Sequence, residues 1–376
     1  MRKIAFLAAL FAFLSCGSSA KSDPEPTPEP PGPEKPAIVF AKGSDISWAS
    51  EMEAGGRSFK KKDGTAAPLL DVLKDCGFNA IRLRVWVNPY EGWSGKGDIV
   101  SVAKKVKAAG LSLMVDFHYS DFFADPSRQL VPSVWKADAN DVDKMAVHVA
   151  EHTKDVLSAL KGTGVEVKWI QIGNETRGGM LYPAGKLNYD RKGDEFYGFL
   201  KLYNAGYDAA KTIFPDAFVM PHLNNAFDSS NNTWWFGQFK AQGGKFDMVA
   251  LSHYPQYEKD PSGTNSKAVS YIKSAAAALG VPVMISEVGV KSKANEASAK
   301  SLLKSFMDQV TKLDQCAGVF YWEPEVDGVW KPEIYTKPAE LSKYSGKTET
   351  GAWNAYDQGA FTTDGKPTSV LDVFAD

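Results

Sequence analysis

Residues 111–118 read Leu-Ser-Leu-Met-Val-Asp-Phe-His, and residues 282–288 read Pro-Val-Met-Ile-Ser-Glu-Val. Both contain an unbroken apolar run, Leu113-Met114-Val115 in one and Val283-Met284-Ile285 in the other. Strands that are apolar on both faces are typical of a parallel sheet covered by helices. In each stretch an acidic residue comes directly or almost directly after the run. The two segments therefore indicate an α/β protein with polar groups at one edge of its sheet.

Similar apolar stretches alternate with amphipathic helical patterns along the rest of the chain. The expected strands are 43–48, 80–86, 111–118, 167–173, 218–223, 248–254, 282–288 and 318–322. The expected helices are 66–75, 98–109, 141–160, 195–213, 234–242, 267–279 and 296–313, with a short last one at 369–374. Eight strands alternating with helices predict a closed (β/α)₈ TIM barrel. A doubly wound open sheet is the alternative, but the first strand is not followed by a Gly-rich phosphate loop.

The N-terminus has the features of an export signal. Arg2 and Lys3 precede an apolar run at 4–14, which fits a secretory signal peptide and is too short to span a bilayer. The residues around Cys16 resemble a bacterial lipoprotein cleavage site, so we expect residues 1–16 to be a signal peptide cut before a lipidated Cys16. An ordinary signal peptide cut after Ala20 is the alternative.

Residues 17–36 precede the folded domain, which we place at 37–376, and are rich in proline, with Pro-Glu-Pro-Thr-Pro-Glu-Pro-Pro-Gly-Pro at 24–33. Such a tract forms an extended, semi-rigid spacer, although a Pro-rich interaction ligand is a further possibility. A lipidated cysteine followed by a spacer predicts an outer-membrane lipoprotein. Its domain would face the periplasm or the cell surface, and a lipid anchor would be its only contact with the membrane.

The composition excludes some partners. The net charge of −2 gives no basic surface for nucleic acid, and 44% hydrophobic residues suit an ordinary globular core, which we expect to be monomeric. Cys76 and Cys316 precede apolar runs, where a cysteine behaves as a small buried hydrophobe, so we expect two free thiols rather than a disulfide. No CxxC and no zinc-ligand spacing is present.

Polar and aromatic side chains occupy the ends of nearly all the expected strands. In barrel enzymes the active site lies at the C-terminal strand ends, so this clustering indicates a site there. The residues are Asp45, Arg84, Trp86, Asp116, His118, Asn174, Glu175, His222, His253, Tyr254, Glu287, Trp322 and Glu323.

Two of these residues are carboxylates on strands that face each other across a barrel. Glu175 ends the fourth expected strand and Glu287 ends the seventh. Cleavage of a glycosidic bond needs an acid that protonates the leaving oxygen and a carboxylate that stabilises or attacks the sugar. A separation of about 5–5.5 Å gives retention of configuration, and about 6.5–9.5 Å gives inversion. A salt-bridged strand end is the alternative for either residue alone.

Longer motifs resemble a known family. Gly173-Asn174-Glu175 and Ser286-Glu287-Val288-Gly289 resemble the retaining barrel glycosidases of clan A. The runs Arg-Leu-Arg-Val-Trp-Val-Asn-Pro at 82–89 and Asp-Phe-His-Tyr-Ser-Asp-Phe-Phe-Ala-Asp-Pro at 116–126 are similar to glycoside hydrolase family 53, the endo-β-1,4-galactanases. The resemblance extends from about residue 43 to residue 353.

The resemblance implies a retaining, endo-acting hydrolase of β-1,4-galactan (arabinogalactan type I, pectin side chains), with Glu175 as acid/base and Glu287 as nucleophile. It implies that Asn174 binds the 2-hydroxyl of the sugar, and that Arg84 and Tyr254 hold Glu287 ionised. Trp322 would lie under the sugar. Expected walls of the cleft are Trp86, Trp135 and Trp353, and expected partners of sugar hydroxyls are Asp45, Asp116, His118, His222 and His253. For each histidine a structural hydrogen bond is an equal alternative.

No cofactor is expected. Some relatives carry a calcium loop of alternating Asp, His and Asn ligands, whereas the segment after Pro255 lacks that alternation, so calcium is possible but not expected.

Three other functions are open. His118, His222 and His253 end strands, as in metal-dependent barrel hydrolases, but the first strand lacks the usual His-x-His. A surface glycan-binding protein could keep the barrel without catalysis. The same chemistry could also act on another β-1,4-glycan such as mannan or cellulose, because the fold does not determine the substrate.

Overall fold

The structure is a computed structural model that describes residues 39–348 and 357–375. The proposed signal peptide, lipidation site and Pro-rich linker lie outside the described residues, and so does Trp353. Residues from Val39 onward form one compact unit.

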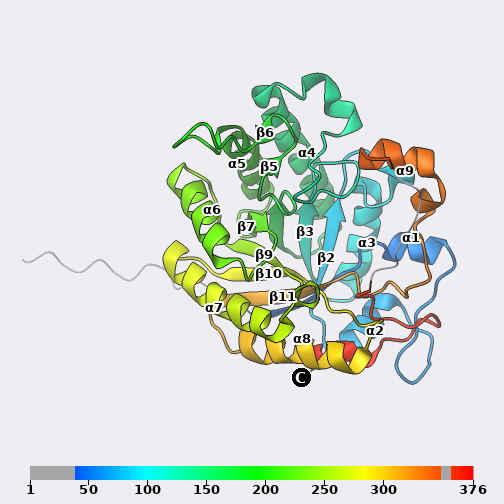
Figure 1. Cartoon of the computed structure of the whole chain (residues 1–376). Coiled ribbons are helices and arrows are strands. Elements are labelled where there is room, and N and C mark those ends of the chain that lie inside the picture. The colour runs from blue at the N-terminus through cyan, green and yellow to red at the C-terminus, as the bar shows by residue number, and fades with distance from the viewer. Residues whose placement is uncertain (1–38, 349–356, 376) are drawn as a thin grey trace, which may run out of the picture. The chain divides into compact units, whose positions relative to one another are not determined.

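Parallel strands surround the centre of this unit (Figure 1). Their order in the sheet is β7-β4-β3-β2-β1-β11-β10-β9-β8. Only Pro221 separates β7 from β8 in the chain, so the two ends of the sheet are pieces of one strand and the sheet closes into a barrel. Proline interrupts the strand because it has no N–H to donate. The strands are β1 (Ala41–Asp45), β2 (Ala80–Val85), β3 (Ser112–Phe117), β4 (Val167–Ile172), β7 (Phe218–Met220), β8 (His222–Leu223), β9 (Val249–His253), β10 (Val283–Val288) and β11 (Cys316–Trp322). The expected strands and the TIM barrel are thereby confirmed.

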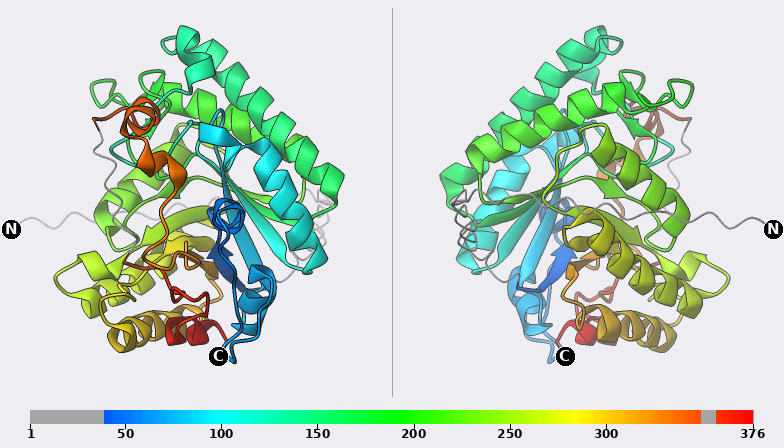
Figure 2. Two further views of the ribbon diagram at one scale, coloured as in Figure 1. Left: turned by 90° about the vertical axis from the view of Figure 1, so that its right-hand side faces the viewer. Right: turned by 90° about the vertical axis from the view of Figure 1, so that its left-hand side faces the viewer.

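Helices form an outer layer around the strands (Figure 2). They are α1 (Ala49–Ala54), α2 (Leu69–Asp75), α3 (Lys96–Ala108), α4 (Val142–Thr163), α5 (Tyr197–Ile213), α6 (Ser229–Ala241), α7 (Pro261–Leu279), α8 (Glu296–Val310) and α9 (Pro338–Ser345). In the described part of the chain, none is long and apolar enough to cross a membrane.

Capping side chains explain why α6 and α7 begin before their expected first residues. Asp228 accepts a hydrogen bond from the N–H of Asn231, and Asp260 accepts one from the N–H of Gly263. These caps satisfy free N–H groups, so α6 and α7 begin earlier than the apolar pattern predicts.

The sequence did not predict α1, α9 or the small hairpin of β5 (Gly179–Met180) and β6 (Gly185–Lys186). The last expected helix is a 3₁₀ helix, Ser369–Phe374.

The barrel interior is apolar at one end and polar at the other. One cluster of buried side chains, among them Met114, Trp169, Met284 and Phe320, fills the N-terminal part. Gly43 is required there, because an added Cβ would lie 2.1 Å from the ring of Phe320. A much larger cluster lies between the strands and the helices. Cys76 and Cys316 are buried free thiols, as expected.

Candidate active site

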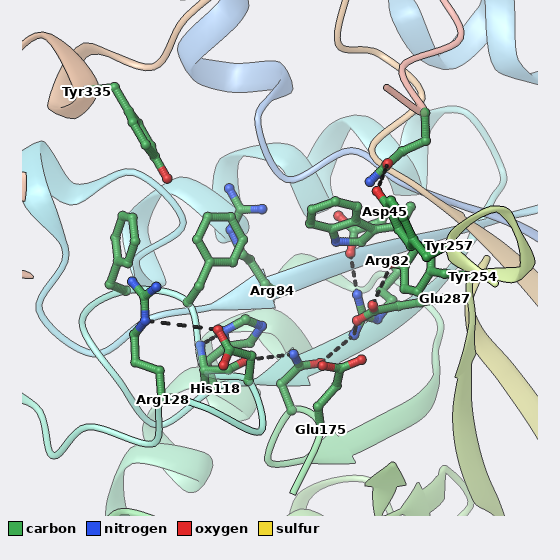
Figure 3. A pocket seen from close by; sticks show the side chains of 17 residues that line it. Asp45, Arg82, Arg84, His118, Arg128, Glu175, Tyr254, Tyr257, Glu287 and Tyr335 are labelled. Carbon is green, nitrogen blue, oxygen red and sulfur yellow. Dashed lines mark hydrogen bonds and ion pairs between the residues drawn. The ribbon is translucent and has the colours of Figure 1, made fainter. Parts of the chain in front are cut away.

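A cleft of about 480 Å³ opens at the C-terminal ends of the strands (Figure 3). Eight of the residues predicted for the site line it, namely Asp45, Arg84, His118, Asn174, Glu175, Tyr254, Glu287 and Trp322. The other lining residues are Arg82, Phe122, Phe123, Ala124, Asp125, Arg128, Tyr257, Tyr335 and Gln358. The strand-end pattern therefore located a real concave site.

Arg82 on β2 lies at the floor of the cleft and is 1% exposed. Its guanidinium donates to Asp45 (2.6 Å), Asp116 (2.8 Å), Asn174 (3.0 Å) and Glu287 (2.8 Å). Burial alone would lower the pKa of Arg82, but the neighbouring carboxylates raise it above its ordinary value. One fixed cation thus orients side chains from several strands.

Glu287 on β10 is held at both carboxylate oxygens. Arg82 donates to Oε1, and the hydroxyl of Tyr254 donates to Oε2 at 2.8 Å. A register shift between Ile285 and Glu287 places Glu287 opposite Ser252 of β9. Burial raises the pKa of Glu287 above its ordinary value, and the Arg82 cation and the Tyr254 hydrogen bond oppose that rise. These two contacts favour the ionised form.

Glu175 follows β4 in a left-handed backbone conformation, with φ of 47°. This conformation is costly for a residue other than glycine, and such strain is concentrated at functional sites. The hydroxyl of Ser252 lies 2.7 Å from Oε1 of Glu175, and no cation contacts this carboxyl among the described residues. Burial and the neighbouring charge of Glu287 raise the pKa of Glu175 to about 8. Glu175 is therefore protonated at neutral pH.

The two carboxyl groups lie close together, because one hydroxyl contacts both. Ser252 Oγ is 2.7 Å from Glu175 Oε1 and 3.3 Å from Glu287 Oε2. These oxygens cannot be farther apart than the two contacts laid end to end. Carboxyl groups that approach each other this closely are the arrangement that a retaining mechanism uses.

Asn174 is fixed beside the pair. Its amide nitrogen donates to the carbonyl of Ala124 at 2.8 Å, and its oxygen accepts from Arg82 and from Gln171, each at 3.0 Å. The ring of His222 lies below it, with Nδ1 2.9 Å from the Asn174 oxygen and Nε2 2.8 Å from Ser252 Oγ. Burial holds the pKa of His222 well below its ordinary value, so the ring is neutral.

The expected contact between Arg84 and Glu287 is wrong. Arg82 makes that contact, while Arg84 forms an ion pair with the buried Glu323. The guanidinium of Arg84 also lies over the rings of Trp48 (4.0 Å) and Phe123 (4.8 Å). Arg82 and Arg84 are two positions apart and share a face of β2, but Arg82 is one layer deeper and nearer to the centre of the barrel.

Three other predicted residues lie behind the surface of the cleft. Asp116 is fully buried and accepts from Arg82 and from Nε2 of His118 at 2.9 Å. Trp86 donates to Nδ1 of His118 at 3.3 Å and stacks on Phe122. His222, described above, is the third, and all three support the side chains that line the cleft.

Two predicted residues are not brought to the cleft. His253 packs against Phe306 in the helical layer, and its Nε2 bonds Asn265 at 2.8 Å. Trp135 stacks on His148, a residue of α4. His253 thus makes the structural hydrogen bond that was the alternative for each histidine, and Trp135 packs against α4 instead of forming a wall of the cleft.

Arg82 and Ser252 are site residues that the sequence reasoning missed. A signal for both was available in the period of two along a strand. Arg82 lies two residues before Arg84, and Ser252 lies two residues before Tyr254, so each shares the face of a predicted site residue.

Within residues 39–348 and 357–375, no group of three or more His, Cys, Asp or Glu side chains is placed to hold a metal ion. The expectation that no cofactor is required stays a prediction.

Comparisons with known proteins identify the family. Residues 41–374 match the profile of glycosyl hydrolase family 53. The chain belongs to this family.

Relatives within family 53 cover most of the chain. A probable arabinogalactan endo-β-1,4-galactanase A of Neosartorya fischeri is 32% identical over 314 residues, which are 77% of this chain and 85% of that protein. An arabinogalactan endo-β-1,4-galactanase of Thermothelomyces thermophilus is 29% identical over 303 residues, or 74% of this chain and 88% of the relative.

Solved structures agree with the family assignment. A fungal β-1,4-galactanase superposes with a TM-score of 0.74 at 26% identity, covering 90% of this chain and 99% of the other. The family 53 catalytic domain of Ignisphaera aggregans gives 0.75 at 24% identity, covering 91% and 97%.

Proposed function

We propose that this protein is an endo-acting, retaining β-1,4-galactanase, with Glu287 as nucleophile and Glu175 as acid/base. The observation that carries the proposal is the close carboxylate pair at Ser252, one member paired with Arg82 and the other raised in pKa to about 8. Family membership and relatives named as arabinogalactan endo-β-1,4-galactanases support the substrate.

The reaction takes place in two displacements. In the first, a carboxylate oxygen of Glu287 bonds to the anomeric carbon while the bond to the leaving oxygen breaks. Glu175 gives its proton to that oxygen, which leaves as a hydroxyl. In the second, Glu175, now ionised, takes a proton from water as the water oxygen attacks the same carbon. The bond to Glu287 breaks, and both carboxyl groups return to their starting states.

The rest of the site suits a neutral polymer. Arg84 lies in the wall of the cleft, where its buried guanidinium packs on the rings of Trp48 and Phe123 and adds a positive charge. Trp322 supplies an aromatic surface for a sugar ring, and Asn174 and Asp45 supply polar groups. The reaction uses side chains alone, and we expect no calcium requirement.

We also propose that the protein is an exported, monomeric lipoprotein that does not bind nucleic acid. Export and the lipid anchor rest on the signal-like segment before Cys16 and the Pro-rich spacer, and the lack of nucleic-acid binding rests on the net charge of −2. A single acyl chain attaches a protein only marginally, so stable anchoring needs more than one. Metabolic labelling with a fatty acid, with Cys16→Ser as the control, tests the anchor.

Hydrolysis of unbranched β-1,4-galactan by the parent, Glu175→Ala and Glu287→Ala tests the activity. The parent should release short oligosaccharides with a rapid fall in viscosity, and the first product anomer seen by NMR should be β. Both variants should be nearly inactive. Binding of galactan without cleavage by the parent would favour the glycan-binding alternative, and cleavage of mannan or cellulose instead would change the substrate.

A further inference from the structure

Two exposed aromatic rings lie side by side outside the cleft. Tyr189 is 56% exposed and Trp234 is 41% exposed, and their ring centroids are 5.8 Å apart with planes inclined by 37°. Tyr189 belongs to the segment after β6, and Trp234 to the middle of α6; both segments lie at the same side of the barrel (Figure 1). Adjacent large apolar side chains left in solvent often mark an interaction site.

The pair rests on rigid structure. Trp234 packs on Phe196 at 6.0 Å, and Phe196 is fully buried against Trp235 and other core rings. Backbone bonds from Asn188 to Glu195 and from Asp194 to Arg191 close the loop that carries Tyr189. The segments that carry the two rings are therefore held by backbone bonds and by core packing, which reduces the entropy lost on binding.

Contacts of neighbouring residues connect α6, which carries Trp234, to the segment that follows the catalytic Glu175. Arg177 lies two residues after Glu175, and its guanidinium donates to Asp228 and Asn232 at the beginning of α6. The indole of Trp235 donates to the carbonyl of Arg177 at 2.9 Å. The positive charge of Arg177 also acts on Tyr189, opposing the rise in its pKa that burial causes. The helix that carries Trp234 is therefore fixed to the segment after Glu175, so the pair lies on the Glu175 side of the barrel.

We propose that Tyr189 and Trp234 form a binding platform for the part of a β-1,4-galactan chain that lies beyond the cleaved bond, on the leaving-group side. This rests on the proposed function. Glu175 donates its proton to the leaving oxygen, so the chain segment nearest to Glu175 is the leaving segment. A galactopyranose ring has a face made of adjacent C–H groups, which stacks on aromatic rings, and two such rings suit successive sugars of a chain.

The test is binding of oligosaccharides of different lengths by calorimetry, in the inactive Glu287→Ala background. Tyr189→Ala and Trp234→Ala should each weaken binding of long galactan chains about threefold to tenfold and leave the affinity for galactobiose unchanged. Tyr197→Ala is the matched control, because Tyr197 is 45% exposed but its ring is covered by Arg191 at 4.9 Å. The control should match the parent at every length.

Other results would overturn the platform. These are equal affinity of parent and variants for long chains, equal losses for long and short chains, or a similar loss in Tyr197→Ala. A dimer of the parent that Trp234→Ala dissociates would assign the pair to contact between copies instead. If the otherwise unsubstituted enzyme cleaves galactan while the variants bind normally, only the platform fails; if it does not cleave or bind galactan of any length, the proposed function fails as well.

Discussion

The ends of β4 and β10 carry the same residue type in surroundings that differ in charge. Glu287 contacts a guanidinium and a phenol, whereas Glu175 contacts the Ser252 hydroxyl and has no cation beside it in the described structure. Burial raises the pKa of both carboxyls. The lesson is that Arg82, rather than burial, separates their roles. Glu287, next to the cation, can hold a negative charge, and Glu175 keeps its proton.

Glu175→Gln removes the group that donates the proton and should have the largest effect on activity. A positioned acid contributes about 10²–10⁴-fold, so kcat/KM on galactan should fall by that range. The loss should be much smaller on an aryl galactobioside, whose leaving group needs little protonation.

The pH profile of the parent checks the same residue. Glu175 must be protonated to donate, and its pKa is about 8, so kcat/KM should decrease as the pH rises through about 8. This alkaline limb should disappear in Glu175→Gln. A limb near the ordinary carboxyl value of 4.5 would contradict the assignment of the proton.

Arg82→Lys weakens the ion pair that orients the nucleophile Glu287. A lysine ammonium is a point charge and cannot reproduce the fork that reaches Asp45, Asp116 and Glu287 together. Losing a charged hydrogen bond costs about 1.5–3 kcal/mol, so we expect kcat to fall about 10- to 100-fold on galactan and on the aryl substrate alike. Arg84→Lys is the matched control from the same strand face and should cost less.

Ser252→Ala removes the hydroxyl that bridges the two regions. The Ser252 hydrogen bond lowers the pKa of Glu175, so its loss should move the alkaline limb to higher pH, with kcat reduced about tenfold. Ser286→Ala provides the control, since Ser286 is buried beside Glu287 and its hydroxyl has no partner within the described residues. If the alkaline limb of the pH profile moves in both serine variants, or in neither, the Ser252 hydroxyl does not set the pKa of Glu175.

The sequence predicted the barrel and the carboxylate pair because unbroken apolar runs and polar strand ends are local patterns. How deep a side chain lies in the barrel, and to which face of its strand it points, were harder to predict. Arg82 and Arg84 share a face, and no local pattern says which one reaches Glu287. Adjacent residues of a strand point to opposite faces, so placing Tyr254 in the cleft should have turned His253 outward and Ser252 inward. Trp135 lies in a 3₁₀ helix, Ser133–Asp138, where neither the strand period nor the α-helix period applies.

His253→Gln tests that argument with the smallest expected effect. His222 and His253 lie on the neighbouring strands β8 and β9, but the Ser252 hydroxyl contacts the ring of His222, and His253 bonds Asn265 among helices. We expect kcat and the alkaline limb to stay unchanged and the free energy of unfolding to fall by about 1 kcal/mol.

The stability of the protein should also depend on pH through His253, because burial lowers the pKa of His253 to about 4. The folded state therefore lacks a proton that the unfolded state binds below about 6.5, and the parent loses stability as the pH falls through this window. His253→Gln should lose less between these pH values in denaturant titrations, whereas a changed kcat would place His253 in the site after all.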